Sequence, residues 1–414
     1  MYDHQLTTEQ CEFRDTVRDF VTHEVKPVIL HPDRLQDSSR PLPLELIDQA
    51  SRMGLRTLAL SEESGGAGAD NLTCCVVMEE LGAGDVDIAM PLGQTSLLAR
   101  ALFDGAMSEE QRTRFLPLFM KDDRYHLAFA AAEPHANLAW KYHREAERVA
   151  DCRVKAAQQS NGDWVVSGET GFVANAPLAK LIALQAKNAA GGLVTLLIPS
   201  DTPGLTIRDT ANAVRQDTPT VKWYHGAGGE LTLKDCPVPG DNVVSAERAG
   251  ALSRAVGASH PLYYAMNLGI GRAALEEGVE YAKLRVQGAR RIIEHQAIGT
   301  ILANAAIRIE VARAILWHAA WALDHPDERT DRHVFDLPLD AIARVFTSEA
   351  VYKATEEAAE CFGGSGVMLD MPLPKYIRDA RIFLHSRDSN TVARFRIAEA
   401  LAGFVRPTAV KTAA

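Results

Sequence analysis

The sequence lacks most of the features that would place a protein outside the ordinary globular class. Its six cysteines include no Cys-x-x-Cys pair, and their spacing fits no zinc-ligand pattern. No window holds about 18 consecutive apolar residues, the length that a membrane-spanning helix needs. The first residues, MYDHQLTTEQ, have neither the basic nor the apolar region of a signal peptide. We therefore expect a reduced cytoplasmic protein with no metal site and no membrane span.

Long runs of one charge are also missing. The 44 Lys and Arg residues are outnumbered by 54 Asp and Glu residues, which gives a formal net charge of -10 at pH 7. Because phosphate contacts need clustered cations, this balance disfavours a nucleic-acid surface. With 414 residues, 47% of them hydrophobic, the chain is long enough for two or three domain-sized units. The composition favours a large soluble protein that binds no nucleic acid.

The first part of the chain carries helix signals. Thr7 and Gln10 have the spacing of a capping box, and apolar residues follow at helical intervals. Asp70 is placed to cap a helix over NLTCCVVMEELG, in which Cys74 and Cys75 are expected to be small core residues. We predict an N-terminal α-helical domain over residues 1–122.

The pattern changes to strands and then returns to helices. Residues 123–245 contain short runs such as DWVVSGE, LIALQAK and LVTLLIPS, separated by turn residues, which is typical of a compact β-domain. Residues 246–414 contain long helix-forming stretches, one of which ends at a Gly-Gly pair. We predict an α+β multidomain fold with a middle β-domain and a C-terminal helical bundle.

Six segments, taken together in their order and spacing, resemble the acyl-CoA dehydrogenase family over nearly the whole chain. They are MGLRTLALSEESGGAGADNLTCCVVMEEL, EEQRTRFLPLF, AAEPHANLAW, VSGETGFVANA, LRVQGARRIIEHQAIG and CFGGSGVMLDMPLPKYIRDARI. The resemblance implies a middle β-barrel-like domain and a C-terminal four-helix bundle, usually in a dimer of dimers. It implies FAD bound between domains and across a subunit interface, and an acyl-CoA substrate. An electron-transfer flavoprotein is one electron acceptor that it allows.

The resemblance also suggests which residues hold the cofactor. Gly363 and Gly364 would let the backbone approach the FAD diphosphate of a neighbouring subunit. Their alternative interpretation is a helix end followed by a turn. Arg285, in register with Gln296, would pair with the diphosphate, which suits a bidentate guanidinium. Its alternative interpretation is a solvated cation at a helix end.

Several positions on the flavin side depart from the family pattern. Ala132 and Ala174 stand where the family has threonines, and Leu138 stands at a serine position. Phe172 replaces a tryptophan and can still cover a flavin face, and Glu360 replaces a glutamine before Gly-Gly. Each lost donor removes roughly 1 kcal/mol of cofactor binding. Many flavin contacts in the family use backbone groups, which these substitutions leave in place.

The sharpest departure concerns the catalytic base. The family removes a proton with the glutamate of a Glu-Gly-Thr segment, where this chain has Arg387, Asp388 and Ser389. By the same resemblance, Ser389 would contact the cofactor. An arginine cannot act as a base at neutral pH. A second location that some members use corresponds to about Ser259, which is not a carboxylate. Asp388 is the nearest substitute, and its alternative interpretation is the N-cap of the last helix.

Further roles stay open around this segment. His260 and His385 are additional candidates for the base, or else packed or surface histidines. Arg387 would bind an acidic acyl tail, stabilise an anionic reduced flavin, or pair with a neighbour such as Asp388. Arg378 and Asp379 are expected to form a structural ion pair without a chemical role.

Three functions are consistent with this pattern. The first is an FAD-dependent oxidoreductase that acts on a CoA thioester with a displaced or altered base. The second is a catalytically degenerate subunit of a heteromeric acyl-CoA dehydrogenase, in which a paralogous chain supplies the base. The third is a flavin-dependent monooxygenase of the same fold, which needs no such base. We expect a homo-oligomer or a hetero-oligomer with a paralogue.

Overall fold

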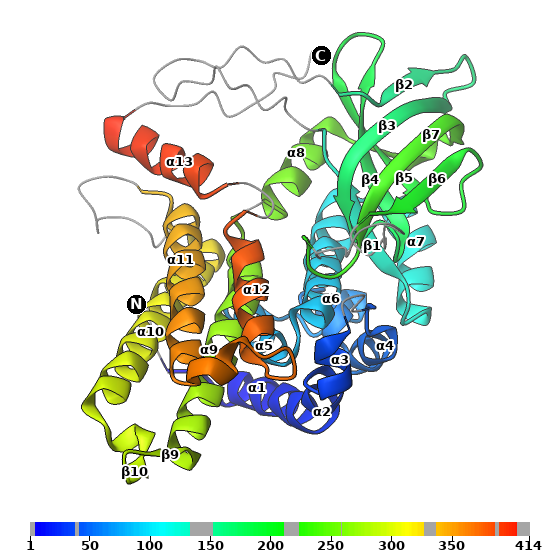
Figure 1. Cartoon of the computed structure of the whole chain (residues 1–414). Helices are drawn as coiled ribbons and strands as arrows, with labels where there is room; N and C mark the ends of the chain where they lie inside the picture. Colours follow the sequence, from blue (N-terminus) through cyan, green and yellow to red (C-terminus); the bar gives the residue numbers. More distant parts are fainter. Residues whose placement is uncertain are drawn as a thin grey trace.

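The computed structural model describes residues 5–37, 41–132, 152–210, 223–257, 259–326, 337–385 and 389–403. Figure 1 shows helices at the start of the chain, a β-sheet in the middle and a second group of helices at the end. The predicted α+β fold of three parts is confirmed. We propose domain boundaries after residues 122 and 245, since α7 ends at Lys121 and β8 ends at Val244.

The N-terminal helices begin at the predicted caps. The Thr7 hydroxyl accepts the Gln10 N–H at 3.2 Å and the Gln10 side chain accepts the Thr7 N–H at 3.0 Å, so the capping box is confirmed. Asp70 accepts the Thr73 N–H at 2.7 Å. The helices are α1 (Thr8–Phe20), α2 (Lys26–Ile29), α3 (Pro32–Gln36), α4 (Leu44–Arg52), α5 (Asn71–Gly84), α6 (Val86–Ala99) and α7 (Glu109–Lys121), with π-helical turns at Val21–Val25 and Arg100–Ala106 and 3₁₀ turns at Leu55–Thr57 and Glu62–Ser64.

The middle part forms one mixed sheet. In the part of the chain that the structure describes, its strand order is β6-β7-β3-β2-β4-β5-β8, and β1 pairs with β4. The pairs β1–β4 and β2–β4 are parallel and the others are antiparallel. The strands are β1 (His126–Ala130), β2 (Lys155–Gln158), β3 (Trp164–Ala174), β4 (Ala179–Asn188), β5 (Leu193–Pro199), β6 (Leu205–Asp209), β7 (Gly228–Val238) and β8 (Val243–Val244), with a 3₁₀ turn at Gly240–Asn242.

In the C-terminal part, α10, α11 and α12 pack around α9, and α13 packs on α11. His260 is the N-cap of α9, and Pro261 lies in its first turn, where proline is favoured. The helices are α8 (Ala246–Ala255), α9 (Pro261–Leu284), α10 (Gln296–Asp324), α11 (Leu339–Glu360), α12 (Leu373–Phe383) and α13 (Asn390–Ala402). A two-stranded hairpin, β9 (Val286–Gln287) and β10 (Arg290–Arg291), and a 3₁₀ turn at Ile292–Glu294 join α9 to α10. Another 3₁₀ turn, Gly363–Val367, lies between α11 and α12. Among the described residues, no helix is both long and apolar enough to cross a membrane.

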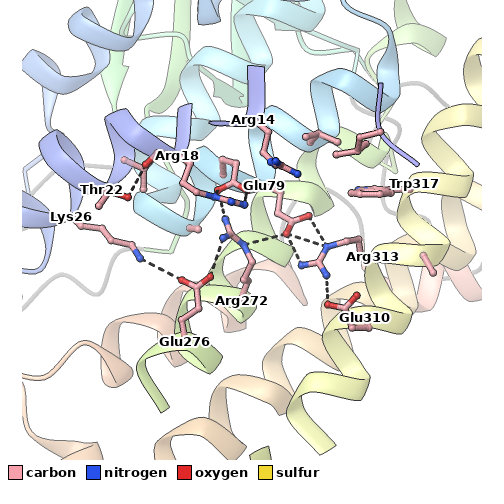
Figure 2. Close-up of a pocket in the computed structure, with 16 residues that line it drawn as sticks. Arg14, Arg18, Thr22, Lys26, Glu79, Arg272, Glu276, Glu310, Arg313 and Trp317 are labelled. Carbon is pink, nitrogen blue, oxygen red and sulfur yellow. Dashed lines mark hydrogen bonds and ion pairs between the residues drawn. The ribbon is translucent and has the colours of Figure 1, made fainter. Parts of the chain in front are cut away.

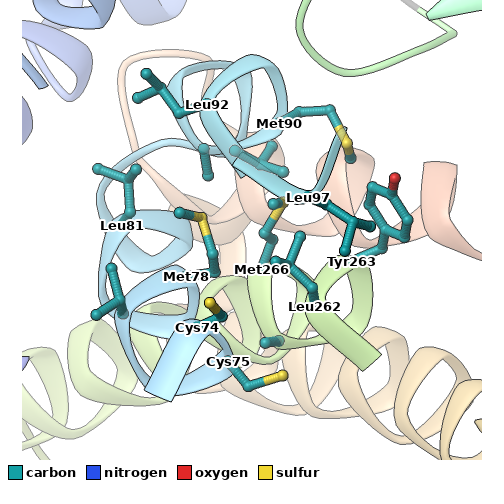
Figure 3. Close-up of a cluster of buried hydrophobic side chains, with 14 of the residues drawn as sticks. Cys74, Cys75, Met78, Leu81, Met90, Leu92, Leu97, Leu262, Tyr263 and Met266 are labelled. Atoms are coloured by element: carbon teal, nitrogen blue, oxygen red, sulfur yellow. The ribbon is translucent and has the colours of Figure 1, made fainter. Parts of the chain in front are cut away.

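Helix α5 lies at the centre of the helical core, where it packs on α6 and α9 (Figure 3). All of its residues are buried, as expected for a helix that is apolar on most sides. Cys74 and Cys75 are 1% and 0% exposed, so their prediction as core residues is confirmed. Burial raises the pKa of the Cys74 thiol to about 12, which keeps it protonated and unreactive.

Candidate functional site

A cavity of about 1390 Å³ lies between the sheet and the C-terminal helices. One wall comes from β1, β3, the side chain of Gln185 on β4 and the segment that leads into β7. The other wall comes mainly from α8 and α12, with Tyr352 of α11. Gln94 and Leu98 of α6 also line the cavity, so all three parts of the chain meet at one site.

The sheet wall contains three of the residues that the resemblance singled out. Ala132, Phe172 and Ala174 all line the cavity. The Phe172 ring lies edge-on to Trp223 and Tyr224, with centroid distances of 4.6 and 4.5 Å. Neither Trp223 nor Tyr224 is predicted from the sequence, because both follow a segment that carries no strand pattern. The three aromatic rings give the cavity an apolar surface.

Two glutamines supply the polar groups of this wall. Gln94 of α6 donates to the Ala174 carbonyl at 3.3 Å. Its Oε1 atom is buried and has no hydrogen-bond partner among the described residues. Gln185 accepts the Ala132 N–H at 3.0 Å and donates to the Ser253 hydroxyl of α8 at 3.1 Å. Ala132 is thus held in place within the protein, whereas Gln94 offers a free acceptor to a ligand.

Helix α12 presents one continuous face to the cavity. The residues on this face recur at intervals of three and four, and they are Pro374, Ile377, Arg378, Arg381 and Ile382, with His385 following just after the end of the helix. Their exposure rises along the helix, from half-buried Arg378 to exposed Arg381 and His385. None of the described lining residues is Asp or Glu. The cavity is therefore lined by cations on this side. The spacing of Arg378, Arg381 and His385 in the sequence would have predicted that they share one face of a helix.

Buried charges hold α12 against the N-terminal helices. Lys375 pairs with Asp379 at 2.6 Å and with Asp85 at 3.1 Å. Burial alone would lower the pKa of Lys375, but the two carboxylates outweigh it and raise that pKa. The predicted ion pair between Arg378 and Asp379 is wrong. Consecutive helical residues point in different directions, whereas Lys375 and Asp379 are four apart and lie on one face.

A histidine connects the same helix to the loop that precedes β7. The ring of His225 is 2% exposed, with Nε2 2.9 Å from the Asp379 carbonyl oxygen and Nδ1 3.3 Å from an Asp87 carboxylate oxygen. It also stacks on Phe383 with a centroid distance of 5.2 Å. The loop that carries Trp223 is thereby fixed to both α6 and α12.

The segment that follows α12 contains the predicted catalytic residues. Arg387 and Asp388 lie outside the described residues. Ser389 is the N-cap of α13, since its hydroxyl accepts the Val392 N–H at 3.3 Å. The prediction that Asp388 caps this helix is wrong by one residue, because the helix starts at Asn390 and its first turn requires the acceptor at 389. The predicted cofactor contact of Ser389 stays a prediction.

The second family location for a base is occupied by a structural network. Ser259 is 6% exposed and accepts from Arg396, which also pairs with Asp340 at 2.9 Å. His260 accepts the Leu262 N–H at 3.3 Å as the cap of α9. Neither Ser259 nor His260 lines the cavity. Their positions favour the packed interpretation of His260 over its role as a base.

Four of the predicted cofactor residues lie outside the cavity. Arg285, Gln296, Gly363 and Gly364 are exposed and do not line it. Arg285 ends α9 beside the β9–β10 hairpin. The hairpin turn is Gly288-Ala289, the pair that replaces the family's Phe-Gly, and both residues have positive φ. The structure therefore separates these four residues from Ala132, Phe172 and Ala174, as expected if they contact a ligand in another subunit.

A second cavity, of about 780 Å³, is lined by charged residues from α1, α5, α9 and α10 (Figure 2). Glu79 pairs with Arg313 at 2.8 Å, and Glu80 pairs with Arg272 at 2.6 Å and Arg18 at 2.7 Å. Both glutamates are nearly inaccessible, with 5% and 4% exposure. Because the buried charges satisfy one another, this network is suited to joining helices rather than to binding a ligand.

The three-part fold and the cavity at the junction of sheet and helices define a class of α–β–α proteins that hold a large ligand between domains. Sequence profiles described as acyl-CoA dehydrogenase, N-terminal domain and acyl-CoA dehydrogenase, C-terminal domain match residues 7–123 and 252–402. The chain belongs to the acyl-CoA dehydrogenase family.

Individual relatives match over almost their whole length. A probable acyl-CoA dehydrogenase of Bacillus subtilis, YngJ, is 29% identical over 407 residues, which is 96% of this chain and 99% of the relative. Butyryl-CoA dehydrogenase from Megasphaera elsdenii has a TM-score of 0.79 at 24% identity, over 97% of this chain and 100% of that chain. A glutaryl-CoA dehydrogenase from Mycobacterium smegmatis, solved with FADH2, has a TM-score of 0.77 at 20% identity, over 96% and 95% of the two chains. The two solved structures support the fold.

Proposed function

We propose that this protein is an FAD-dependent oxidoreductase that acts on a CoA thioester with a displaced or altered base. The observation that carries this proposal is the cavity between β1, β3 and α12, which contains the residues aligned with the flavin-side positions of the family. Membership of the family supplies the class of reaction.

The residues of the cavity fit a flavin. A flavin ring is flat and largely apolar, with hydrogen-bonding groups along one edge, and Phe172 and Trp223 offer aromatic surface in the cavity against which it can pack. The unpaired Oε1 of Gln94 is an acceptor for a ring N–H. Arg285 and the Gly363-Gly364 pair would contact the diphosphate of an FAD held by a neighbouring subunit. Bound FAD supplies the hydride acceptor of the reaction.

The proton acceptor is the part of the proposal that departs from the family. Among the described residues that line the cavity, His385 is the one histidine, and there is no carboxylate. Asp388 stays a candidate by its position in the sequence. The described residues of the cavity therefore include several groups that can bind and orient a ligand. Among them, His385 is the one ordinary candidate for a base.

A subunit of a heteromeric dehydrogenase is the second candidate. The same lack of a carboxylate in the described lining favours it, as do the exposed positions of Arg285, Gly363 and Gly364. In this arrangement a paralogous chain would supply the base, and the present chain would supply cofactor contacts across the interface.

An absorption spectrum of the purified protein, recorded with and without added FAD, tests the proposal. We expect a yellow protein whose flavin absorbance bleaches when one acyl-CoA from a chain-length series is added. Bleaching only in the presence of a paralogous chain would favour the second candidate. A protein that stays colourless after incubation with FAD would exclude both, and oxygen uptake by the reduced flavin with hydroxylation of a substrate would favour a monooxygenase.

A further inference from the structure

We propose that Arg378 binds an oxyanion, a carboxylate or phosphate oxygen, of the ligand that occupies the large cavity. The inference rests on the proposed function, because it names the part of the cofactor or thioester that the cavity recognises. It concerns a residue that the sequence analysis had expected to form a structural ion pair.

The guanidinium of Arg378 lacks the partner that its environment requires. Its Nη2 atom is buried, and it has no hydrogen-bond partner in the part of the chain that the structure describes. The carboxylate of Asp379, the next residue, pairs with the Lys375 ammonium group at 2.6 Å and is therefore not a partner of Arg378. A buried cationic N–H that stays unpaired is destabilising. The position of Nη2 is therefore explained best by a ligand that accepts a hydrogen bond from it.

The surroundings of Arg378 specify the charge of that ligand. It lines the large cavity together with Arg381 and His385, and the described lining of this cavity contains no Asp or Glu. Arg378 also borders a small pocket with three aspartates, but Asp85 and Asp379 pair with Lys375, and Asp87 lies beside His225. An arginine in such a place favours a planar anion, because its parallel N–H groups match the two oxygens of a carboxylate or phosphate. The site therefore selects a ligand with negative charge close to α12.

The gradient of exposure along α12 places Arg378 at the inner end of the cationic face. Arg381 and His385 are exposed, whereas Arg378 is half-buried with one buried N–H group. Arg381 also lies over the Tyr352 ring, with 5.1 Å between the guanidinium carbon and the ring centroid. A cation at the rim is screened by water, so Arg378 should contribute most to the recognition of an anion.

The acyl chain, the CoA moiety and FAD can each provide the oxyanion, and binding measurements separate these three sources. The probes are FAD, butyryl-CoA and glutaryl-CoA, and the two thioesters differ by one terminal carboxylate. We expect Arg378→Gln to weaken the binding of at least one probe by roughly 10- to 100-fold, the loss of a charge-assisted contact. The matched variant Arg381→Gln should change the same affinity by less than about fivefold. Arg378→Lys should retain part of the affinity, because lysine keeps the positive charge but lacks the two parallel N–H groups of the guanidinium.

The pattern of losses identifies the source. A loss for glutaryl-CoA alone assigns the anion to the acyl chain, an equal loss for both thioesters assigns it to CoA, and a loss for FAD assigns it to the cofactor. Unchanged affinity for all three probes would overturn the inference while leaving the proposed function in place. A wild-type protein that binds none of the probes would refute both.

Thermal unfolding of the ligand-free protein provides a second readout. Since the buried Nη2 of Arg378 has no partner among the described residues, Arg378→Gln should leave the midpoint unchanged or raise it. A clear fall in the midpoint would show that Arg378 has a structural partner, and the oxyanion site would then be rejected.

Discussion

At the scale of single residues, the aromatic wall of the cavity depends on a glycine in the neighbouring strand. Gly228 of β7 pairs with Ala174 of β3, and a Cβ atom at this position would lie 2.0 Å from Cζ of Phe172. The Phe172 ring fills the space that the missing side chain leaves. Its contacts with Trp223 and Tyr224 therefore require a glycine at 228.

Gly228→Ala should displace the Phe172 ring and weaken the binding of FAD. The clash involves the far end of a side chain, so the ring can rotate away, and we expect a stability loss below about 1 kcal/mol. The lost aromatic contact should lower the affinity for FAD by roughly two- to tenfold. Fluorescence titration with FAD measures the change. Gly192→Ala, where the new Cβ would have ordinary contacts of 3.5 Å or more, serves as the control. Equal FAD affinities for the two variants would contradict this account of the wall.

At the scale of secondary-structure elements, the contact between α5 and α9 is set by two glycines. A Cβ atom on Gly82 would lie 2.4 Å from the Met266 carbonyl oxygen, and one on Gly269 would lie 2.2 Å from the Glu79 carbonyl oxygen. Both clashes are with backbone, which cannot rotate away. The two helices are therefore close enough that only glycine fits on each side, and α9 in turn supports α12 and the cavity.

Gly269→Ala should destabilise the protein by about 3 kcal/mol, because the two helices must separate to admit the methyl group. Chemical denaturation followed by circular dichroism measures the shift of the midpoint. Gly299→Ala in α10 is the matched control, since its new Cβ would meet nothing within 4 Å. There the better helix propensity of alanine should stabilise the protein by up to about 1 kcal/mol. Equal stability of the two variants would show that the close packing of α5 on α9 does not restrict which side chain fits at position 269.

At the scale of the whole molecule, local sequence signals predicted much of the fold and less of the site. The caps at Thr7 and Asp70 and the succession of helical, strand and helical regions were predictable, because each depends on neighbouring residues. The partner of Asp379 was not, because the choice between Arg378 and Lys375 depends on which side of α12 faces the N-terminal helices. Gln94 and Trp223 could not be predicted as site residues either, because only tertiary packing brings them to the cavity.

The acid stability of the molecule should depend on a histidine that joins its first two parts. His126 of β1 is 3% exposed, and its Nδ1 lies 3.0 Å from the Thr95 hydroxyl of α6. Burial, aided by the positive charge of Arg56, lowers the pKa of His126 to about 4 from an ordinary value of 6.5. Between these two values the unfolded chain binds a proton that the folded protein does not. Stability is therefore fully present above about pH 6.5 and falls as the pH decreases toward 4.

We expect this single histidine to account for about 3 kcal/mol of the stability lost between pH 7 and pH 4, at about 1.4 kcal/mol for each pKa unit. Denaturation midpoints measured across this range should fall less steeply for His126→Gln than for the wild type. The comparison uses slopes, so it holds even where the variant is less stable at every pH. His23→Gln, which changes a side chain that is 67% exposed, should keep the slope of the wild type. Parallel slopes for the wild type and His126→Gln would show that the acid sensitivity arises from other groups, such as the buried carboxylates that pair with Lys375.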